Sequence, residues 1–119
     1  HPRAKPLDVE IRIEELEMEA NSVAAIGLII NEMTANCLKH AFPEGKRGRL
    51  SITAAKRDGR FVIRVEDDGI GIPEGVSLSQ GGGFGFQLIE MLSSQINGVV
   101  RLERPKRGSA MVLEIPLVS

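Results

Sequence analysis

The chain has few aromatic residues and little cysteine: its 119 residues include four Phe, no Trp, no Tyr and one Cys. So few rings leave little for nucleobases to stack on. The lone Cys37 cannot form an internal disulfide and is typical of a reducing compartment. Fifteen basic and sixteen acidic residues give a net charge of -1, which removes the electrostatic argument for nucleic acid or an anionic membrane as partner.

Long apolar runs and targeting signals are also missing. The longest apolar run, Val23 to Ile30, is far below the roughly 20 residues of a membrane helix, and no signal-peptide pattern opens the chain. At 42% hydrophobic residues, a chain of this size can bury one core without metal or disulfide. Because it begins at His1 rather than Met, we expect a single cytoplasmic domain, residues 1–119, excised from a longer protein that can carry a sensor or a membrane anchor.

The first third of the chain predicts strands followed by a long helix. Apolar and charged residues alternate at 9–13 and again at 16–18, which predicts two short strands paired antiparallel. Apolar residues then recur at helical spacing from residue 23 to residue 41. Asn21 and Ser22 are expected to cap the N-terminus of this helix.

Two strand pairs and a second helix are predicted after it. Asp58-Gly59 lies between alternating segments and is a strong hairpin signal. Apolar spacing at 86–96 predicts an amphipathic helix ended by Asn97-Gly98. The four predicted strands are 52–54, 61–65, 99–103 and 110–115. This order predicts an α+β fold, a two-layer sandwich in which helices cover one face of a mixed, mostly antiparallel sheet.

A polar stripe on the first predicted helix has two interpretations. Glu32, Asn36 and Lys39 lie within roughly 40° of one another on a helical projection, with His40 at the edge. An ordinary solvated helix face has this pattern. A carboxylate, an amide oxygen and an ammonium on successive turns also suit a magnesium triphosphate, because Mg²⁺ prefers hard oxygens and phosphates prefer a cation.

Two carboxylates, Asp67 and Asp68, end a predicted strand just before Gly69. A buried carboxylate there could accept a hydrogen bond from the exocyclic amine of adenine, whereas the carbonyl of guanine would be repelled. An acid/base pair or a metal site is the alternative interpretation. Adjacent strand residues point to opposite faces, however, so only one of the two is expected to face a pocket.

A glycine-rich segment, Gly81 to Phe86, precedes the second predicted helix. Exposed backbone N–H groups beside a helix N-terminus can bind phosphate oxygens. A glycine-rich lid without ligand contacts explains the composition nearly as well. Neither the P-loop pattern nor a Rossmann fingerprint after a strand is present.

Four segments in the right order together resemble the N-box and the three glycine motifs of the GHKL ATPase superfamily. They are NEMTANCLKHAFP (31–43), VEDDGIGIP (65–73), GGGFGFQLIEML (81–92) and RGSAMVLEIP (107–116). The resemblance covers nearly the whole chain. It is greatest to the ATP-binding catalytic domain of bacterial two-component sensor histidine kinases, in the subgroup with an N-box of the form NELxxNxxKHAFP.

The resemblance implies a Bergerat-type fold that holds ATP between the N-box helix and a loop over the sheet. By position it makes Asn36 the Mg²⁺ ligand, and it makes Glu32 the carboxylate that helps activate the phosphoryl acceptor or supports the water shell of the metal. It places Lys39 and His40 at phosphate and ribose. It makes Asp67 the reader of the adenine amine. The other implied ATP contacts are Gly69, Gly71, Ile72, Gly83, Phe84, Gly85, Phe86 and Ser109.

Three departures from the family pattern stand out. Asp68 replaces a common asparagine, and a carboxylate facing the nucleotide would weaken binding; we expect Asp68 to face outward. Phe84 and Phe86 replace the usual leucines. The predicted lid between residues 73 and 83 is short and has no phenylalanine box.

The resemblance implies that the domain binds Mg-ATP and donates the γ-phosphoryl group to a histidine on a separate helical dimerisation domain. Neither His1 nor His40 lies in an acceptor-like context. The implied parent is a homodimer in a phosphorelay, and its downstream partner is a response regulator. Three alternatives remain: an anti-sigma-factor-type serine kinase, an ATP-driven clamp of the chaperone, topoisomerase or mismatch-repair type, and a degenerate module that has lost its nucleotide.

Overall fold

The computed structural model describes residues 7–41, 48–71 and 84–117. Its helices are α1 (Ala20–Ala41) and α2 (Phe84–Gln95). Its strands are β1 (Leu7–Ile13), β2 (Gly48–Arg57), β3 (Arg60–Asp67), β4 (Val99–Glu103) and β5 (Ser109–Pro116). No helix in this part of the chain is long and apolar enough to cross a membrane.

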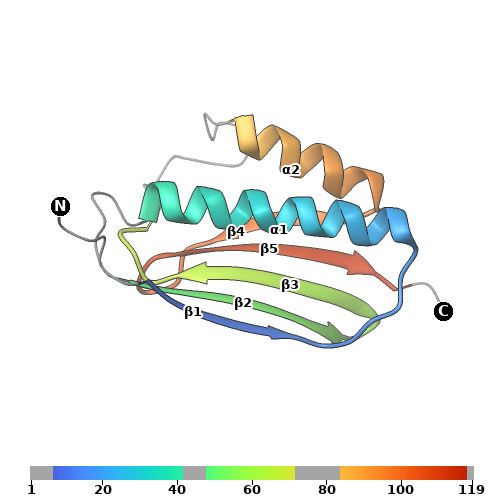
Figure 1. The fold of residues 1–119 in the computed structure, drawn as a ribbon, viewed down its shortest axis with the longest axis horizontal. Helices are drawn as coiled ribbons and strands as arrows, with labels where there is room; N and C mark the ends of the chain where they lie inside the picture. The colour runs from blue at the N-terminus through green and yellow to red at the C-terminus, as the bar shows by residue number, and fades with distance from the viewer. Residues whose placement is uncertain (1–6, 42–47, 72–83, 118–119) are drawn as a thin grey trace.

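The five strands form one sheet in the order β1-β2-β3-β5-β4. β1 pairs with β2 in parallel, and the other three pairs are antiparallel. Both helices lie on the same side of the sheet (Figure 1). The predicted α+β sandwich with a mixed, mostly antiparallel sheet is therefore confirmed.

Two local predictions are confirmed by backbone geometry. Asp58 and Gly59 both have positive φ, 50° and 78°, as the tight turn between β2 and β3 requires. Asn97 has φ 59° just after α2, and the Gly98 N–H donates to the Ser93 carbonyl at 2.8 Å. A left-handed residue with such a hydrogen bond ends a helix by satisfying one of its last carbonyls.

The predicted antiparallel pair at the start of the chain is wrong. Only β1 forms there, and its partner is the parallel strand β2. Leu16 and Met18 lie in an irregular connection and pack against the core. No glycine, asparagine or proline lies between Ile13 and Leu16 to make a hairpin turn, so their alternation reflects burial of one side of the connection.

The first helix also begins three residues earlier than predicted, at Ala20. The Val23 N–H already donates to the Glu19 carbonyl at 3.0 Å. Asn21 and Ser22 therefore lie within the first turn and are not the capping residues that the sequence pattern predicted.

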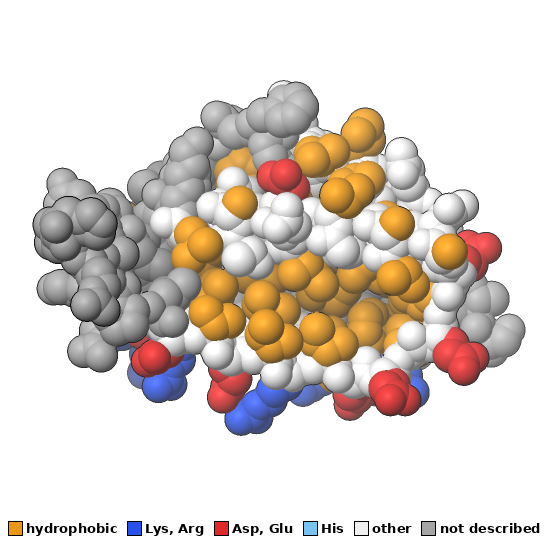
Figure 2. Space-filling model, in the orientation of Figure 1, with side chains coloured by type: hydrophobic (Ala, Val, Ile, Leu, Met, Phe, Trp, Pro, Cys, Tyr) orange, Lys and Arg blue, Asp and Glu red, His pale blue; other side chains and the backbone are white. Residues whose placement is uncertain are grey.

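The hydrophobic core lies between the helices and the sheet. Its fully buried side chains on this side include Ile29, Met33, Leu50, Ile63, Ile89 and Leu113. α1 packs on β3 and α2 on β4, so the helices cover the edge strand β1 less completely. Val9, Ile11 and Ile13 of β1 lie on the same side of the sheet as the buried Leu50 and Ile52 of β2. All three β1 side chains are more than half exposed. Figure 2 shows a band of exposed apolar side chains between α1 and the edge of the sheet at β1.

Candidate functional site

Asp67, the last residue of β3, is the buried carboxylate of the covered face, only 3% exposed. Its Oδ2 atom accepts hydrogen bonds from the Ser109 hydroxyl at 2.8 Å and the Cys37 thiol at 2.9 Å. Its Oδ1 atom accepts one from the Gly69 N–H at 2.9 Å. Because each carboxylate oxygen has two lone pairs, Oδ1 retains the capacity to accept one more hydrogen bond.

Two glycines bring the backbone close to Asp67. Gly108 has φ +76°, and a Cβ atom there would lie 1.9 Å from the Asp67 carbonyl oxygen. Gly71 has φ +82°, and its Cβ would lie 3.0 Å from the Gly108 carbonyl oxygen. The loop after β3 and the turn before β5 therefore pack backbone against backbone, which a side chain at Gly108 would prevent.

Asp68 has the opposite environment. Its side chain is exposed, and its Oδ1 accepts a hydrogen bond from the Arg49 N–H at 2.8 Å. The Asp68 N–H in turn donates to the Arg49 carbonyl at 3.2 Å. As predicted, the two neighbouring carboxylates point to different sides, and Asp68 faces outward.

On α1, Glu32 and Asn36 are half-buried. The Asn36 amide nitrogen and the Thr34 hydroxyl are buried, and neither has a hydrogen-bond partner among the described residues. A buried donor without an acceptor is costly, so the Asn36 amide nitrogen fits a site that a polar ligand completes. The side chains of Lys39 and His40, which were also predicted for this stripe, lie outside the described residues.

The remaining predicted contacts follow β3 or begin α2. Ile72 and Gly83 lie outside the described residues. Phe84 and Gly85 are the first residues of α2, but the structure describes only their backbone. Phe86 is buried in the hydrophobic core, so its side chain has a packing role here. An ATP contact at Phe86 stays a prediction.

Sequence reasoning did not predict a role for Cys37 in the site. It used this residue only as a sign of a reducing compartment and as an apolar position of the helix. The burial of Cys37 and its hydrogen bond to Asp67 raise the pKa of the thiol well above its ordinary value. The signal was present in the helical spacing, because Cys37 follows Asn36 on the side of α1 that meets the sheet. Among the described residues, no group of three His, Cys, Asp or Glu side chains could hold a metal ion.

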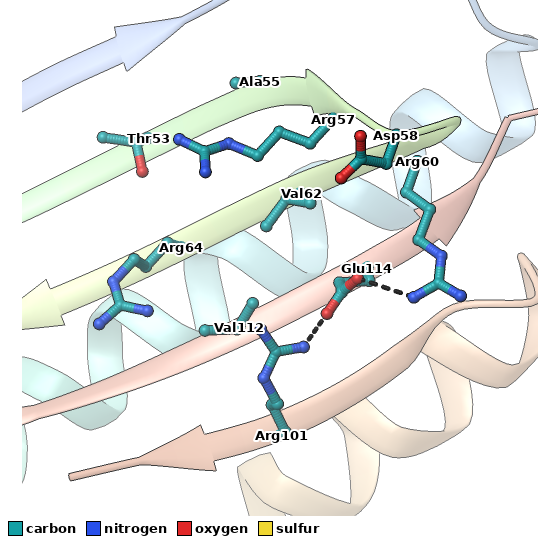
Figure 3. Close-up of a pocket in the computed structure, with 10 residues that line it drawn as sticks. All are labelled: Thr53, Ala55, Arg57, Asp58, Arg60, Val62, Arg64, Arg101, Val112 and Glu114. Carbon is teal, nitrogen blue, oxygen red and sulfur yellow. Dashed lines mark hydrogen bonds and ion pairs between the residues drawn. The ribbon is translucent and has the colours of Figure 1, made fainter.

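A separate hollow of about 680 Å³ lies on the helix-free face of the sheet (Figure 3). Arg60 and Arg101 both pair with Glu114 there, the former at 3.1 Å. Val62 and Val112 contribute to its lining. Four arginines and two carboxylates are among the residues that line it, and these residues lie on the opposite side of the sheet from the Asp67 side chain.

The mixed five-stranded sheet with two helices on one face matches the fold of histidine kinase ATPase domains. The chain belongs to the histidine kinase-, DNA gyrase B- and HSP90-like ATPase family, whose model matches residues 21–119. Within this family, which is part of the GHKL superfamily, it corresponds to the catalytic domain of sensor histidine kinases.

The relatives support this placement. The chain is 26% identical over 112 residues to blue-light-activated histidine kinase 2 of Erythrobacter litoralis, covering 93% of this chain and 32% of that protein. It is 29% identical over 103 residues to the sensor histidine kinase PdtaS of Mycobacterium tuberculosis, covering 84% and 21%. The solved histidine kinase domain of E. litoralis EL346 superposes with a TM-score of 0.84 at 26% identity, covering 93% of this chain and 52% of that one.

Proposed function

We propose that this domain binds Mg-ATP beside Asp67 and α1 and donates the γ-phosphoryl group to a histidine on a separate helical dimerisation domain. The observation that carries the proposal is the Asp67 carboxylate, which is buried and held by three donors yet keeps one acceptor position on Oδ1. Within the described segments Asp67 is bound by neutral donors alone, and a buried carboxylate of this kind is suited to recognise a polar ligand.

Adenine fits this acceptor. Its exocyclic amine donates a hydrogen bond to Oδ1, whereas guanine has a carbonyl at the same position and would oppose the lone pairs of Asp67. The glycines beside Asp67 support this assignment, because Gly69 and Gly71 let the loop turn without side chains that would fill the space. The Ser109 hydroxyl holds Asp67 from the other side at 2.8 Å.

The phosphate end of ATP is assigned to α1 and the start of α2. Asn36 offers an amide oxygen to Mg²⁺, and its N–H group, which has no partner within the described part of the chain, to a phosphate oxygen. When bound, Mg²⁺ neutralises charge on the phosphates. Lys39 and His40 are proposed for phosphate and ribose, and the backbone around Gly83 and Gly85 for phosphate oxygens.

Glu32 is proposed to orient the acceptor histidine or the water shell of the metal. It lies one helical turn before Asn36 and is half-buried. Phosphoryl transfer depends mainly on positioning and charge neutralisation, which a few side chains on one rigid helix can supply.

The partners of the parent protein are also part of the proposal. This chain spans 21–32% of the length of the relatives described above, and those proteins are named as histidine kinases. By that similarity we assign to the parent a dimerisation domain that carries the acceptor histidine, a response regulator as the next recipient of the phosphate, a homodimeric state and a cytoplasmic catalytic part.

Calorimetric titration of this domain with ATP and GTP, with and without Mg²⁺, tests the proposal. We expect ATP to bind more tightly than GTP and Mg²⁺ to strengthen binding. Asp67→Ala should weaken ATP binding about tenfold or more, because one hydrogen bond to a charged group is worth about 1.5–3 kcal/mol. Asp68→Ala is the matched control, since its carboxylate faces outward, and should change affinity less than about twofold.

Three results would contradict the proposal. They are equal affinity for ATP and GTP, an equal loss in the Asp67 and Asp68 variants, or no ATP binding by the folded wild-type domain. Circular dichroism of each variant separates lost binding from lost structure. With ATP binding established, an acid-labile phosphate on an added dimerisation domain would identify histidine as the acceptor.

A further inference from the structure

We propose that Cys37 is a positioning residue for nucleobase recognition: its S–H group donates to Asp67 Oδ2 and thereby orients Oδ1 toward the exocyclic amine of the base. This inference rests on the proposed function, because it needs Asp67 to read adenine. The inference adds a residue of α1 to an adenine-recognition site whose other members lie at the ends of β3 and β5.

The distribution of donors around Asp67 is unequal. Oδ2 accepts from two side chains, Cys37 at 2.9 Å and Ser109 at 2.8 Å, whereas Oδ1, among the residues that the structure describes, accepts only from the Gly69 backbone. With two lone pairs on each oxygen, Oδ2 is saturated and Oδ1 has one free position. Removal of either side-chain donor would leave Oδ2 with a free lone pair and the carboxylate with fewer restraints on its rotation.

The chemistry of the thiol fits this role. The Cys37 side chain is buried and its Sγ atom lies 2.9 Å from Asp67 Oδ2, and a thiol buried in such surroundings keeps its proton and can donate it. Cys37 also belongs to the hydrophobic core cluster together with Met33. A thiol packs as a small apolar group and is a weak donor, and this position needs both properties.

The attachment to α1 gives the contact a further consequence. Cys37 follows Asn36 directly on the helix, and Asn36 is the proposed ligand of Mg²⁺. The thiol therefore links Asp67, the residue proposed to recognise the base, to the helix that is proposed to hold the phosphates. Of the three donors to Asp67, only Cys37 lies on α1.

The test compares ATP with purine riboside triphosphate, an analogue that lacks the exocyclic amine. In the wild-type domain ATP should bind more tightly, because only ATP donates to Oδ1. Cys37→Ala should weaken ATP about fivefold, the size of one ordinary hydrogen bond, and change the affinity of the analogue less than about twofold. Cys37→Ser keeps a donor and should retain most of the preference for ATP.

Ile29→Val is the control for core packing, because Ile29 is fully buried on the same helix and is a purely apolar side chain. It should leave the ratio of the two affinities unchanged. An equal loss of both nucleotides in Cys37→Ala would overturn the inference and make Cys37 a packing residue. An unchanged ratio in Cys37→Ala would do the same.

A spectroscopic measurement needs no cysteine variant and covers the case in which Cys37→Ala does not fold. Cys37 is the only cysteine in the sequence, so the S–H stretching band in the infrared belongs to it alone. We expect this band below the frequency of a free thiol, and we expect ATP to shift it more than the analogue does. A band at the free-thiol frequency, or the same response to both nucleotides, would contradict the inference.

Failure of the inference is distinguishable from failure of the proposed function. If wild type shows no preference for ATP over the analogue, or if Asp67→Ala keeps that preference, the adenine site itself is wrong. If Asp67→Ala abolishes the preference and Cys37→Ala keeps it, only the role of Cys37 is wrong.

Discussion

On the helix-covered face of the sheet the structure places a buried carboxylate, Asp67, whereas on the open face six charged side chains form consecutive ion pairs. Asp67 is held by a thiol, a hydroxyl and a backbone N–H. The open-face pairs run over β3, β4 and β5 in the order Glu66, Arg64, Glu103, Arg101, Glu114 and Arg60. β3 and β5 therefore contribute to both arrangements.

The two faces differ in whether their carboxylates are free to bind a ligand. A carboxylate paired with arginine has its charge neutralised and its oxygens occupied, as on the open face. Neutral donors fix the orientation of Asp67 but leave its charge and one lone pair on Oδ1. A site that recognises an uncharged amine needs a carboxylate held by neutral donors, as at Asp67. The arginine–carboxylate pairs of the open face have a structural role instead.

The largest expected effect is at the contact between Gly108 and Asp67. Gly108→Ala would place a Cβ atom 1.9 Å from the Asp67 carbonyl oxygen at a φ of +76°, so we expect a loss of about 4 kcal/mol or more in the free energy of unfolding. Gly59→Ala is the matched control, because φ is +78° there and no atom lies within 4 Å of the added Cβ. It should cost only about 1–2 kcal/mol of backbone strain, and urea denaturation measures both. Equal losses would show that the close packing around Asp67 has no energetic importance.

A smaller difference is expected between two buried valines on opposite faces. Val65 lies on the covered face, and Val112 lies on the open face between Arg64 and Arg101. Val65→Ala should lower the free energy of unfolding by about 2–3 kcal/mol, because the packed core leaves a cavity. Val112→Ala should cost about 1 kcal/mol, since flexible arginine side chains can move over the gap. Thermal or urea unfolding of the two variants checks the order, and a larger loss for Val112→Ala would contradict the comparison.

The smallest expected effect concerns Glu103 on the open face. Hydrogen bonds from Arg64 and then from Arg101 hold the pKa of Glu103 below its ordinary value. A carboxyl group whose folded pKa is lowered adds stability at pH values above its unfolded pKa, and that stability is lost as the pH falls through the folded pKa. Because the pair is solvent-accessible, Glu103→Gln should cost less than about 1 kcal/mol at neutral pH and low salt.

Urea denaturation of wild type and Glu103→Gln at two pH values and two salt concentrations checks this. The difference between the two proteins should shrink as the pH falls below about 4, where the unfolded chain takes up the proton before the folded protein does, and also at high salt. A difference that is independent of both conditions would show that Glu103 acts through packing and not through its charge.

Local patterns in the sequence predicted much of this fold. Asp58-Gly59 and Asn97-Gly98 marked a hairpin and a helix end because a positive φ favours these residue types. The opening strand pair failed because alternation records which side chains are buried and not which strand is the partner. β1 pairs with β2, whose first residue is 35 positions after Ile13, and no local signal carries that information.

The candidate site divides in the same way. The order of the motifs located Asp67, Asn36 and Ser109, and the alternation of a strand was enough to place Asp67 and Asp68 on opposite sides. The Cys37 contact depends on α1 lying across the end of β3, which no single segment encodes. The burial of the Phe86 side chain in the core was likewise not stated by the motif, because a motif does not say which way a side chain points; its ATP contact stays a prediction.

The sequence by itself determined most of the element types, the tight turns, the family and the candidate residues of an ATP site, because these depend on local backbone preference and on motifs read in order. Only the tertiary structure decided the parallel pairing of β1 and the three donors around Asp67. It also decided the need for glycine at position 108. The physical reason is that hydrogen bonds and close contacts between α1, β3 and β5 join residues 30 to 42 positions apart, and such contacts exist only after the chain has packed.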